Sequence, residues 1–450
     1  MKKRIAIAAL MLTAAIGLAG CAGAAPDQGS GRETGETSSK AAEETGTAAA
    51  DVSSEDCTLT FWTFPFGTDD QLAEERENYQ TMISDFESKN PGIKINIEIL
   101  PWDNRETKML TAIAANQGPD IMYLNPDILK LFKAYGILAP VTQYISEDTL
   151  KEFSGPLLDN SVRFDGELYG LPCLVDMGIP CYNLDLLEKI GMTEENLPET
   201  WDEFDAMLKA CKEKDIYGIY YNYSGSLVSN FAYAQFFSEG CDIIEEDGTV
   251  VIDNDAGKKV LKRLTDWYQN GYTPADSLSV SDNNSMFMSG STASVLSSAG
   301  AGFYRRLAPD ITFNWAAGPV LKGDAGQYAM STVGSLAVTQ TCKNVEAAAK
   351  FLEYFTQDEI NAKWCNFGGY ISPKLGVENP NADLKGYDII LKSLDAVRGE
   401  PNHAAARTMG TVFIPDLQAI VSESVPFDDG VAKMKTDIEG IVAQISQVSN

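Results

Sequence analysis

Basic residues are scarce in this sequence, and it contains a single histidine, His403. Its 35 lysines and arginines stand against 64 aspartates and glutamates, which gives a formal net charge of -29 at pH 7. This charge argues against nucleic acid as a partner, because no basic surface could dominate so negative a field. One histidine also leaves almost no material for histidine-dependent nucleophilic catalysis.

The sequence also lacks the short motifs of common cofactor and metal sites. It contains no P-loop, no glycine fingerprint for dinucleotides, no HExxH, no EF-hand loop and no CxxC. The pair Tyr220-Tyr221 could suggest a ferric ion, but such a site needs several clustered anionic ligands, and no matching set is evident. We therefore expect neither a cofactor nor a metal.

Long apolar runs are absent except at the N-terminus. There, three basic residues precede an apolar core over 5–18, and the core ends in Leu18-Ala19-Gly20-Cys21, which resembles a lipobox. The core is shorter than the roughly 20 residues that a transmembrane helix needs. We predict a lipoprotein signal peptide over 1–20, with Cys21 as the lipidated residue. Residues 21–55 contain no aromatic side chain and predict a flexible linker.

Seven cysteines remain beyond Cys21, an odd number that cannot pair completely. We expect most of them to be small buried hydrophobic residues. Cys173 and Cys181 are the pair to test first for a disulfide.

A chain of 450 residues is too long for one compact core, so two domains are expected. Residues 58–124 show a β-α-β-α-β pattern, which predicts a parallel sheet with helices on both faces. The stretch from Asp165 to Gly191 is apolar but punctuated by glycine and proline, so one uninterrupted strand is not expected there. It predicts a crossing between two lobes; on composition alone it could equally be a loop and strand inside one large domain.

Several short motifs in the folded part occur in a characteristic order. They are Gly118–Asp120, Tyr169–Pro172, Tyr182–Leu186 with Gly191, Pro198 with Thr200–Glu203, Phe287–Gly290 with Ser294–Leu296, and Asn344–Phe355. Together they resemble the extracellular solute-binding proteins of bacterial ABC importers, in particular the sugar-binding group of family 1 type, over roughly residues 55 to 445.

This resemblance implies an α/β, periplasmic-binding-protein-like fold. Two discontinuous α/β lobes would be joined by a three-segment hinge, with the ligand cleft between them. We expect lobe one to comprise 56–171 and 322–368, and lobe two to comprise 172–321 and 369–450.

Ligands of open α/β sheets bind beyond the carboxyl ends of the strands, which selects the loops that follow the expected strands. Aromatic rings there could cover the apolar faces of a sugar, while acids, amides and hydroxyls could bind its hydroxyl groups. Asp176 stands where the family often has a ligand-contacting acid, and for each aromatic residue the alternative is core packing. The candidates are Thr63, Phe64, Asn125, Asp127, Asp176, Tyr223, Ser298, Phe303, Gly334, Ser335, Arg407 and Phe413.

The resemblance further implies a monomeric, non-enzymatic protein that captures a carbohydrate, such as an oligosaccharide, and delivers it to permease subunits. It would act on the extracellular face of the cell membrane, or in the periplasm of a cell with an outer membrane. An extracellular glycoside hydrolase is one alternative, since it needs only two suitably spaced carboxylates. A sugar-sensing or adhesive surface protein is another, because fold does not determine function.

Overall fold

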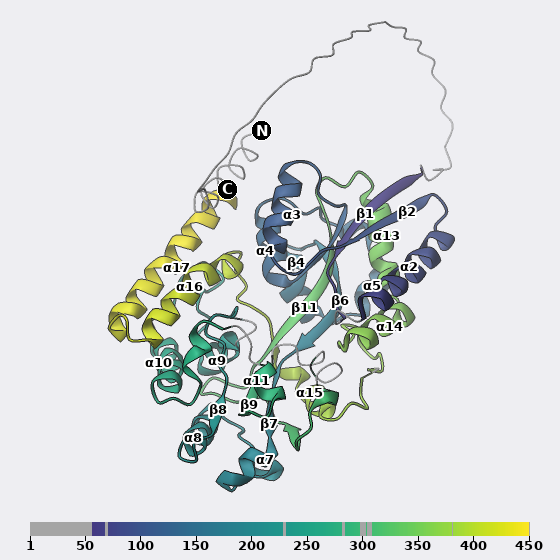
Figure 1. Ribbon diagram of the computed structural model, residues 1–450. Coiled ribbons are helices and arrows are strands. Elements are labelled where there is room, and N and C mark those ends of the chain that lie inside the picture. The colour runs from purple at the N-terminus through teal and green to yellow at the C-terminus, as the bar shows by residue number, and fades with distance from the viewer. Residues whose placement is uncertain are drawn as a thin grey trace, which may run out of the picture.

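The computed structural model describes residues 56–67, 71–227, 231–280, 284–297, 303, 308–379 and 381–449. Within these residues the chain forms two α/β lobes, each built on its own β-sheet (Figure 1). The fold class expected from the sequence is therefore confirmed. The expected signal peptide, Cys21 and the linker lie outside the described residues.

The sheet of lobe one contains β1 (Cys57–Thr63), β2 (Ile93–Ile99), β3 (Ile121–Leu124), β6 (Gly170–Met177), β11 (Ala329–Val338) and β12 (Val397–Arg398). β1 lies parallel to both β2 and β3, which confirms the expected β-α-β-α-β unit. β11 runs antiparallel to β3 on one side and to β6 on the other, and β12 pairs with its first residues.

The helices of lobe one cover this sheet, with α3 and α4 on one side of the strands and α2 and α13 on the other (Figure 1). Tyr79, Met82, Ile83 and Phe86 recur every three to four positions along α2, so they share one face of the helix and are buried. The helices are α2 (Leu72–Lys89), α3 (Arg105–Ala114), α4 (Pro126–Ala134), α5 (Glu147–Lys151), α6 (Gly155–Ser161), α13 (Val345–Phe355) and α14 (Asp358–Gly368). A small hairpin joins β4 (Arg163–Phe164) to β5 (Glu167–Leu168).

The sheet of lobe two has the order β10 (Trp315–Ala317), β7 (Ile179–Asn183), β9 (Thr292–Ser297) and β8 (Tyr217–Ile219). β7 runs antiparallel to β10 and β9, whereas β8 runs parallel to β9. The helices of this lobe are α7 (Leu184–Leu187), α8 (Trp201–Lys212), α9 (Ala232–Glu239), α10 (Asp255–Gln269), α11 (Asn284–Met288) and α15 (Tyr387–Lys392).

Short 3-10 helices occur in both lobes, at Thr142–Tyr144, Glu188–Ile190, Glu194–Asn196, Ala275–Leu278, Ala308–Asp310 and Leu394–Ala396.

The last two helices, α16 (Ala406–Val421) and α17 (Phe427–Ser449), pack against each other, and α16 also packs on α10 of lobe two. The apolar stripe expected in this C-terminal run is buried at Val431, Met434, Ile438 and Ile445. Both helices also contact α4 of lobe one. The C-terminal helices therefore belong to lobe two but reach the other lobe.

The first crossing between the sheets lies later than expected from the sequence. β6 stays in the sheet of lobe one up to Met177, and β7 starts the sheet of lobe two at Ile179, so Gly178 marks the first crossing rather than 171/172. Pro172 does not end β6, because it lies opposite Ser335 where the register shifts, and proline is tolerated at such irregularities. The second crossing falls between β10 and Ala329, an interval that includes the expected boundary at 321/322.

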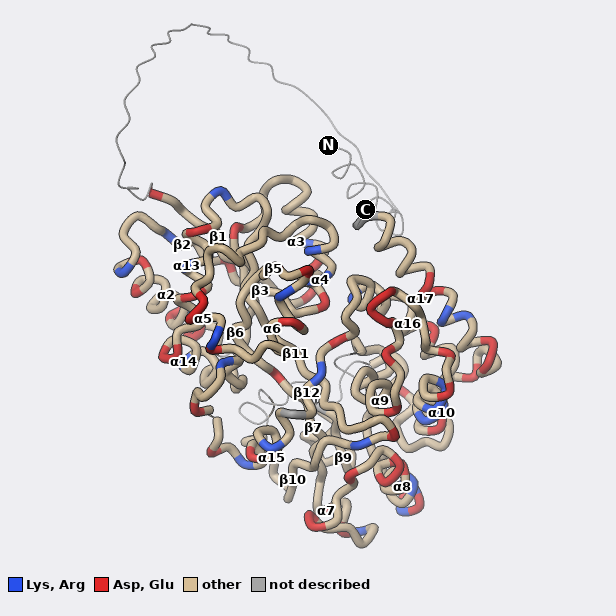
Figure 2. Tube along the Cα trace, turned by 180° about the vertical axis from the view of Figure 1, so that it is seen from behind, with Lys and Arg blue, Asp and Glu red and all other residues tan. Residues whose placement is uncertain are grey.

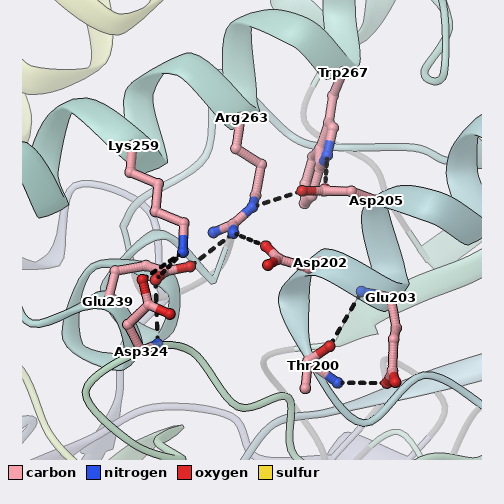
Figure 3. A network of polar contacts seen from close by, with 9 residues as sticks. All are labelled: Thr200, Asp202, Glu203, Asp205, Glu239, Lys259, Arg263, Trp267 and Asp324. Carbon is pink, nitrogen blue, oxygen red and sulfur yellow. Dashed lines mark hydrogen bonds and ion pairs between the residues drawn. The ribbon is translucent and has the colours of Figure 1, made fainter.

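A network of polar contacts ties three helices of lobe two together (Figure 3). Arg263 of α10, whose side chain is 3% exposed, donates to Glu239 of α9 over 2.7 Å and to Asp205 of α8 over 3.0 Å. Lys259 pairs with the other oxygen of Glu239 at 2.7 Å. A capping box between Thr200 and Glu203 starts α8.

Acidic residues are spread over both lobes rather than collected in one place (Figure 2). The seven cysteines from Cys57 onward are all free thiols, and all but Cys57 are buried. This confirms that most of them are packing residues. Cys173 and Cys181, the pair to test first, lie in β6 and β7 and form no disulfide.

Replacing Arg263 with methionine should lower the free energy of unfolding by about 3 kcal/mol, because it removes one partner of the buried Glu239 carboxylate and one of the half-buried Asp205. Lys262→Met is the matched control. Lys262 precedes Arg263 in α10 and forms an exposed pair with Asp266 in the next turn, so its loss should cost under about 0.5 kcal/mol. Urea denaturation followed by circular dichroism measures both. Equal losses in the two variants would show that the network does not hold lobe two together.

Candidate functional site

Aromatic side chains gather where β1, β2 and β3 end at the carboxyl edge of the lobe-one sheet. Phe64 follows β1 and stacks on Trp102, which follows β2, with ring centres 4.7 Å apart. The guanidinium of Arg105 lies 4.6 Å from the centre of the Trp102 ring. Phe64 is only 1% exposed, whereas Trp102 is 38% exposed.

Trp102 was missed by the sequence analysis. Its position could have indicated it, because Trp102 closely follows the strand over 93–99 and ligands of open α/β sheets bind beyond the carboxyl ends of strands. Its indole nitrogen donates a hydrogen bond to the carbonyl of Pro65 over 2.6 Å, so the ring has a fixed orientation. Thr63 and Phe64, which were selected, are both buried and lie behind it. The hydroxyl of Thr63 is hydrogen-bonded to that of Tyr79 at 3.0 Å.

The N-termini of α3 and α4 supply charged residues next to this cluster. Asp127, in the first turn of α4, is 6% exposed and lies 3.4 Å from Nη1 of Arg407. Nε of Arg407 donates to Glu106 of α3 over 2.9 Å. Burial disfavours the charge of Arg407, but Asp127 and Glu106 hold its pKa above the ordinary value. Because Arg407 lies on α16, these ion pairs join lobe two to lobe one.

Three further candidates lie on or beside the paired strands of lobe one. Asp176 is partly exposed near the end of β6, opposite Thr332 of β11. Oδ1 of Asn125 and Oγ of Ser335 are buried and have no hydrogen-bond partner in the structure. Of these three candidates, only Asp176 has a partly exposed carboxylate, and the other two place unpaired polar atoms in the interior.

Gly334 has a packing role in β11. A Cβ atom added there would lie 2.1 Å from the hydroxyl oxygen of Tyr123. The glycine therefore lets Tyr123 of β3 lie against β11, and Tyr123 in turn packs edge-on to Phe66 with ring centres 4.9 Å apart.

Three aromatic candidates lie in the interior of lobe two and present no surface to a ligand in this conformation. Tyr223, Phe303 and Phe413 are each 0% exposed. The hydroxyl of Tyr223 donates to the carbonyl of Leu264 over 2.7 Å, so its polar group is already satisfied. For these residues the structure supports the alternative, core packing, over the expected ligand contact. Ser298 lies outside the described residues.

Among the residues that the structure describes, no group of three or more histidines, cysteines or carboxylates could hold a metal ion. No helix in this part of the chain has the length and hydropathy needed to cross a membrane. The candidate site therefore consists of the exposed ring of Trp102 with nearby carboxylates, amide groups and Arg407.

Residues 81–388 match the family of bacterial extracellular solute-binding proteins, and the chain belongs to this family. A binding protein of Brucella abortus is 29% identical over 323 residues, which cover 68% of this chain and 76% of that protein. The diacetylchitobiose-binding protein DasA of Streptomyces coelicolor is 24% identical over 386 residues, covering 82% of this chain and 83% of that protein.

Solved structures show the same fold. An ABC substrate-binding protein from Listeria monocytogenes, in complex with cycloalternan, superposes with a TM-score of 0.71 at 20% identity. The match covers 85% of this chain and 98% of that chain. The family resemblance noted in the sequence is therefore confirmed.

Replacing Arg407 with glutamine should shift the protein toward an open arrangement of the lobes, because the ion pairs to Glu106 and Asp127 are lost. A loss of about 1 kcal/mol would raise the ratio of open to closed molecules roughly fivefold. Small-angle X-ray scattering of the ligand-free protein measures this as an increased radius of gyration. Lys435→Gln is the control, since it breaks a 2.9 Å pair of similar exposure, Lys435 with Asp253, inside lobe two. Identical scattering from both variants would contradict the prediction.

Proposed function

We propose that this protein is a lipid-anchored, extracellular carbohydrate-binding protein that captures an oligosaccharide and delivers it to the permease subunits of an ABC importer. Family membership supports solute binding outside the cytoplasm. The relative from Streptomyces coelicolor is named for diacetylchitobiose, and the structural neighbour from Listeria monocytogenes holds cycloalternan. Both compounds are oligosaccharides, which supports the same ligand class here.

The observation that carries the proposal is the partly exposed ring of Trp102 at the carboxyl edge of the lobe-one sheet. An aromatic plane of this kind covers the apolar face of a sugar ring. Asp127, Asp176 and Arg407 lie on strands and helices around the same region and can exchange hydrogen bonds with sugar hydroxyls. The set suits a neutral ligand with many hydroxyl groups.

Capture would use hinge bending of the two lobes. A sugar that contacts both lobes stabilises the closed arrangement, and the ion pairs of Arg407 add to that stabilisation. The closed form is the one that would dock on the permease. The sugar leaves chemically unchanged, and the protein works as a monomer without a cofactor.

The location follows from the N-terminal segment. A lipid on Cys21 would hold the protein at the outer face of the cell membrane, and the linker over 21–55 would let the folded lobes reach the permease. In a cell with an outer membrane this place is the periplasm.

Replacing Cys21 with serine should release the protein from the membrane, because no lipid can be attached to serine by a thioether. The expected result is a shift of most of the protein from the membrane pellet to the soluble fraction, measured by fractionation and immunoblotting. Cys57→Ser is the control, since Cys57 lies in the folded part and should leave the fractionation unchanged. Retention of the Cys21 variant in the pellet would contradict lipid anchoring.

The ligand class can be tested by isothermal titration calorimetry with a panel of mono- and oligosaccharides that includes diacetylchitobiose and cycloalternan. We expect at least one oligosaccharide to bind, and Trp102→Ala to weaken it about tenfold because the stacking surface is lost.

Tyr217→Ala is the matched control for Trp102, since Tyr217 is a 43% exposed aromatic residue on β8 of lobe two. Binding of peptides or amines without any sugar would reject the carbohydrate proposal. Recovery of a cleaved sugar after incubation would favour the alternative of a glycoside hydrolase.

A further inference from the structure

Glu400 carries a buried carboxylate that the sequence analysis did not select. The residue follows β12, is 6% exposed, and neither of its side-chain oxygens has a hydrogen-bond partner in the structure. Burying a charged group without donors is costly, so buried carboxylates are normally paired or hydrogen-bonded. An unsatisfied pair of acceptors in the interior therefore needs an explanation.

Both lobes enclose this carboxylate. Lys130 of α4, in lobe one, donates to the carbonyl of Pro401 over 3.4 Å, so α4 lies directly against the segment that carries Glu400. Tyr233 of α9, in lobe two, donates to the carbonyl of Ala406 over 3.3 Å. Glu400 thus lies between lobes, within a few residues of the cross-lobe ion pairs of Arg407.

The charges around Glu400 do not neutralise it through direct hydrogen bonds. Lys130 is itself buried and directs its ammonium group to the Pro401 carbonyl, and Arg407 is bound to Glu106 and Asp127. Burial, reinforced by the nearby charge of Asp127, raises the pKa of Glu400 to about 8. Burial therefore favours the protonated form of this side chain over the charged form.

We propose that Glu400 is a ligand-binding residue, whose two carboxylate oxygens accept hydrogen bonds from adjacent hydroxyl groups of a neutral carbohydrate held between the lobes. Two acceptors on one carboxylate match the spacing of two neighbouring hydroxyl donors on a sugar ring. Lys130 and Arg407 compensate the negative charge that then develops. This inference rests on the proposed function and adds a specificity-determining residue to it.

Ionised Glu400 serves ligand binding but lowers the stability of the folded protein. The pKa of Glu400 in the folded protein lies above its ordinary value, so its stabilising contribution is complete below pH 4.5 and is lost as the pH rises through about 8. Glutamine has a similar shape but cannot ionise. The titratable or charged groups that face Glu400 or adjoin its segment include Asp127, Lys130, Tyr233, Asp242, Glu246, Arg398, His403 and Arg407, and all are unchanged in Glu400→Gln.

The first test needs no ligand. Thermal unfolding between pH 5 and pH 9 should show Glu400→Gln melting about 2 °C or more above the wild type at pH 9, with the difference shrinking toward pH 5. Glu245→Gln, which replaces an exposed acid of lobe two, should follow the wild-type curve. A Glu400→Gln variant that melts below the wild type throughout this range would show that the carboxylate supports the fold, which overturns the proposal.

The second test uses isothermal titration calorimetry at pH 7 with diacetylchitobiose, cycloalternan and the rest of the saccharide panel. For a sugar that binds, Glu400→Gln should weaken the affinity at least tenfold, while Glu245→Gln should not. Binding to the wild type should release about one proton, because hydroxyl donors stabilise the ionised carboxylate, and the observed enthalpy should therefore change with the ionisation enthalpy of the buffer. Glu400→Gln should remove that dependence.

The outcomes separate the two proposals. If the wild type binds no saccharide, the proposed function fails and the role of Glu400 fails with it. If the wild type binds a saccharide and Glu400→Gln binds it equally well, with the same proton release, only the role of Glu400 is overturned. Weaker binding together with a lost proton release supports it, since a merely structural residue would not change the proton count.

Discussion

The antiparallel pairing of β6 with β11 is the interaction on which the rest of the structure depends. These strands run side by side from Gly170 paired with Ala337 to Met177 paired with Ser331. At the latter end β6 leaves for lobe two and β11 arrives from it. A third segment that passes between the lobes, around Ile371, joins β6. Ile371 and Val175 of β6 exchange backbone hydrogen bonds of 2.9 and 3.0 Å. Three chain passages are therefore held in one narrow sheet. Any relative movement of the lobes has to be accommodated at the ends of these strands.

The general fold could be predicted from the sequence because its signals are local. Periodicity located α2 and the strands of the first lobe, and the order of short motifs indicated two discontinuous lobes. Only the first crossing differs from the expected position, because Pro172 suggests an interrupted strand. Whether a proline can remain in a sheet depends on the register of its neighbour, and the irregularity at Gly334 and Ser335 is visible only when the strands are paired.

The site was predicted less well than the fold, since exposure of a side chain is a property of tertiary packing. Phe303 and Phe413 resemble Trp102 as aromatic residues near expected strand ends or helices, yet only Trp102 keeps an exposed ring. No sequence motif marks Glu400, because its distinguishing property is that the fold buries its carboxylate without hydrogen-bond partners. A carboxylate is informative when it is enclosed and unpaired, and the chain contains 64 acidic residues from which sequence alone cannot select one.

Six thiols are enclosed within the folded lobes, four on strands or helices and two in the loops at Cys241 and Cys342. If the protein works outside the cytoplasm, as proposed, it meets oxidising surroundings there. Folding then has to be completed before the thiols react, because a chain caught unfolded would acquire mismatched cross-links that prevent its core from closing. The same enclosure shields the finished protein. The protein therefore tolerates an oxidising environment because the chain folds before its thiols are oxidised.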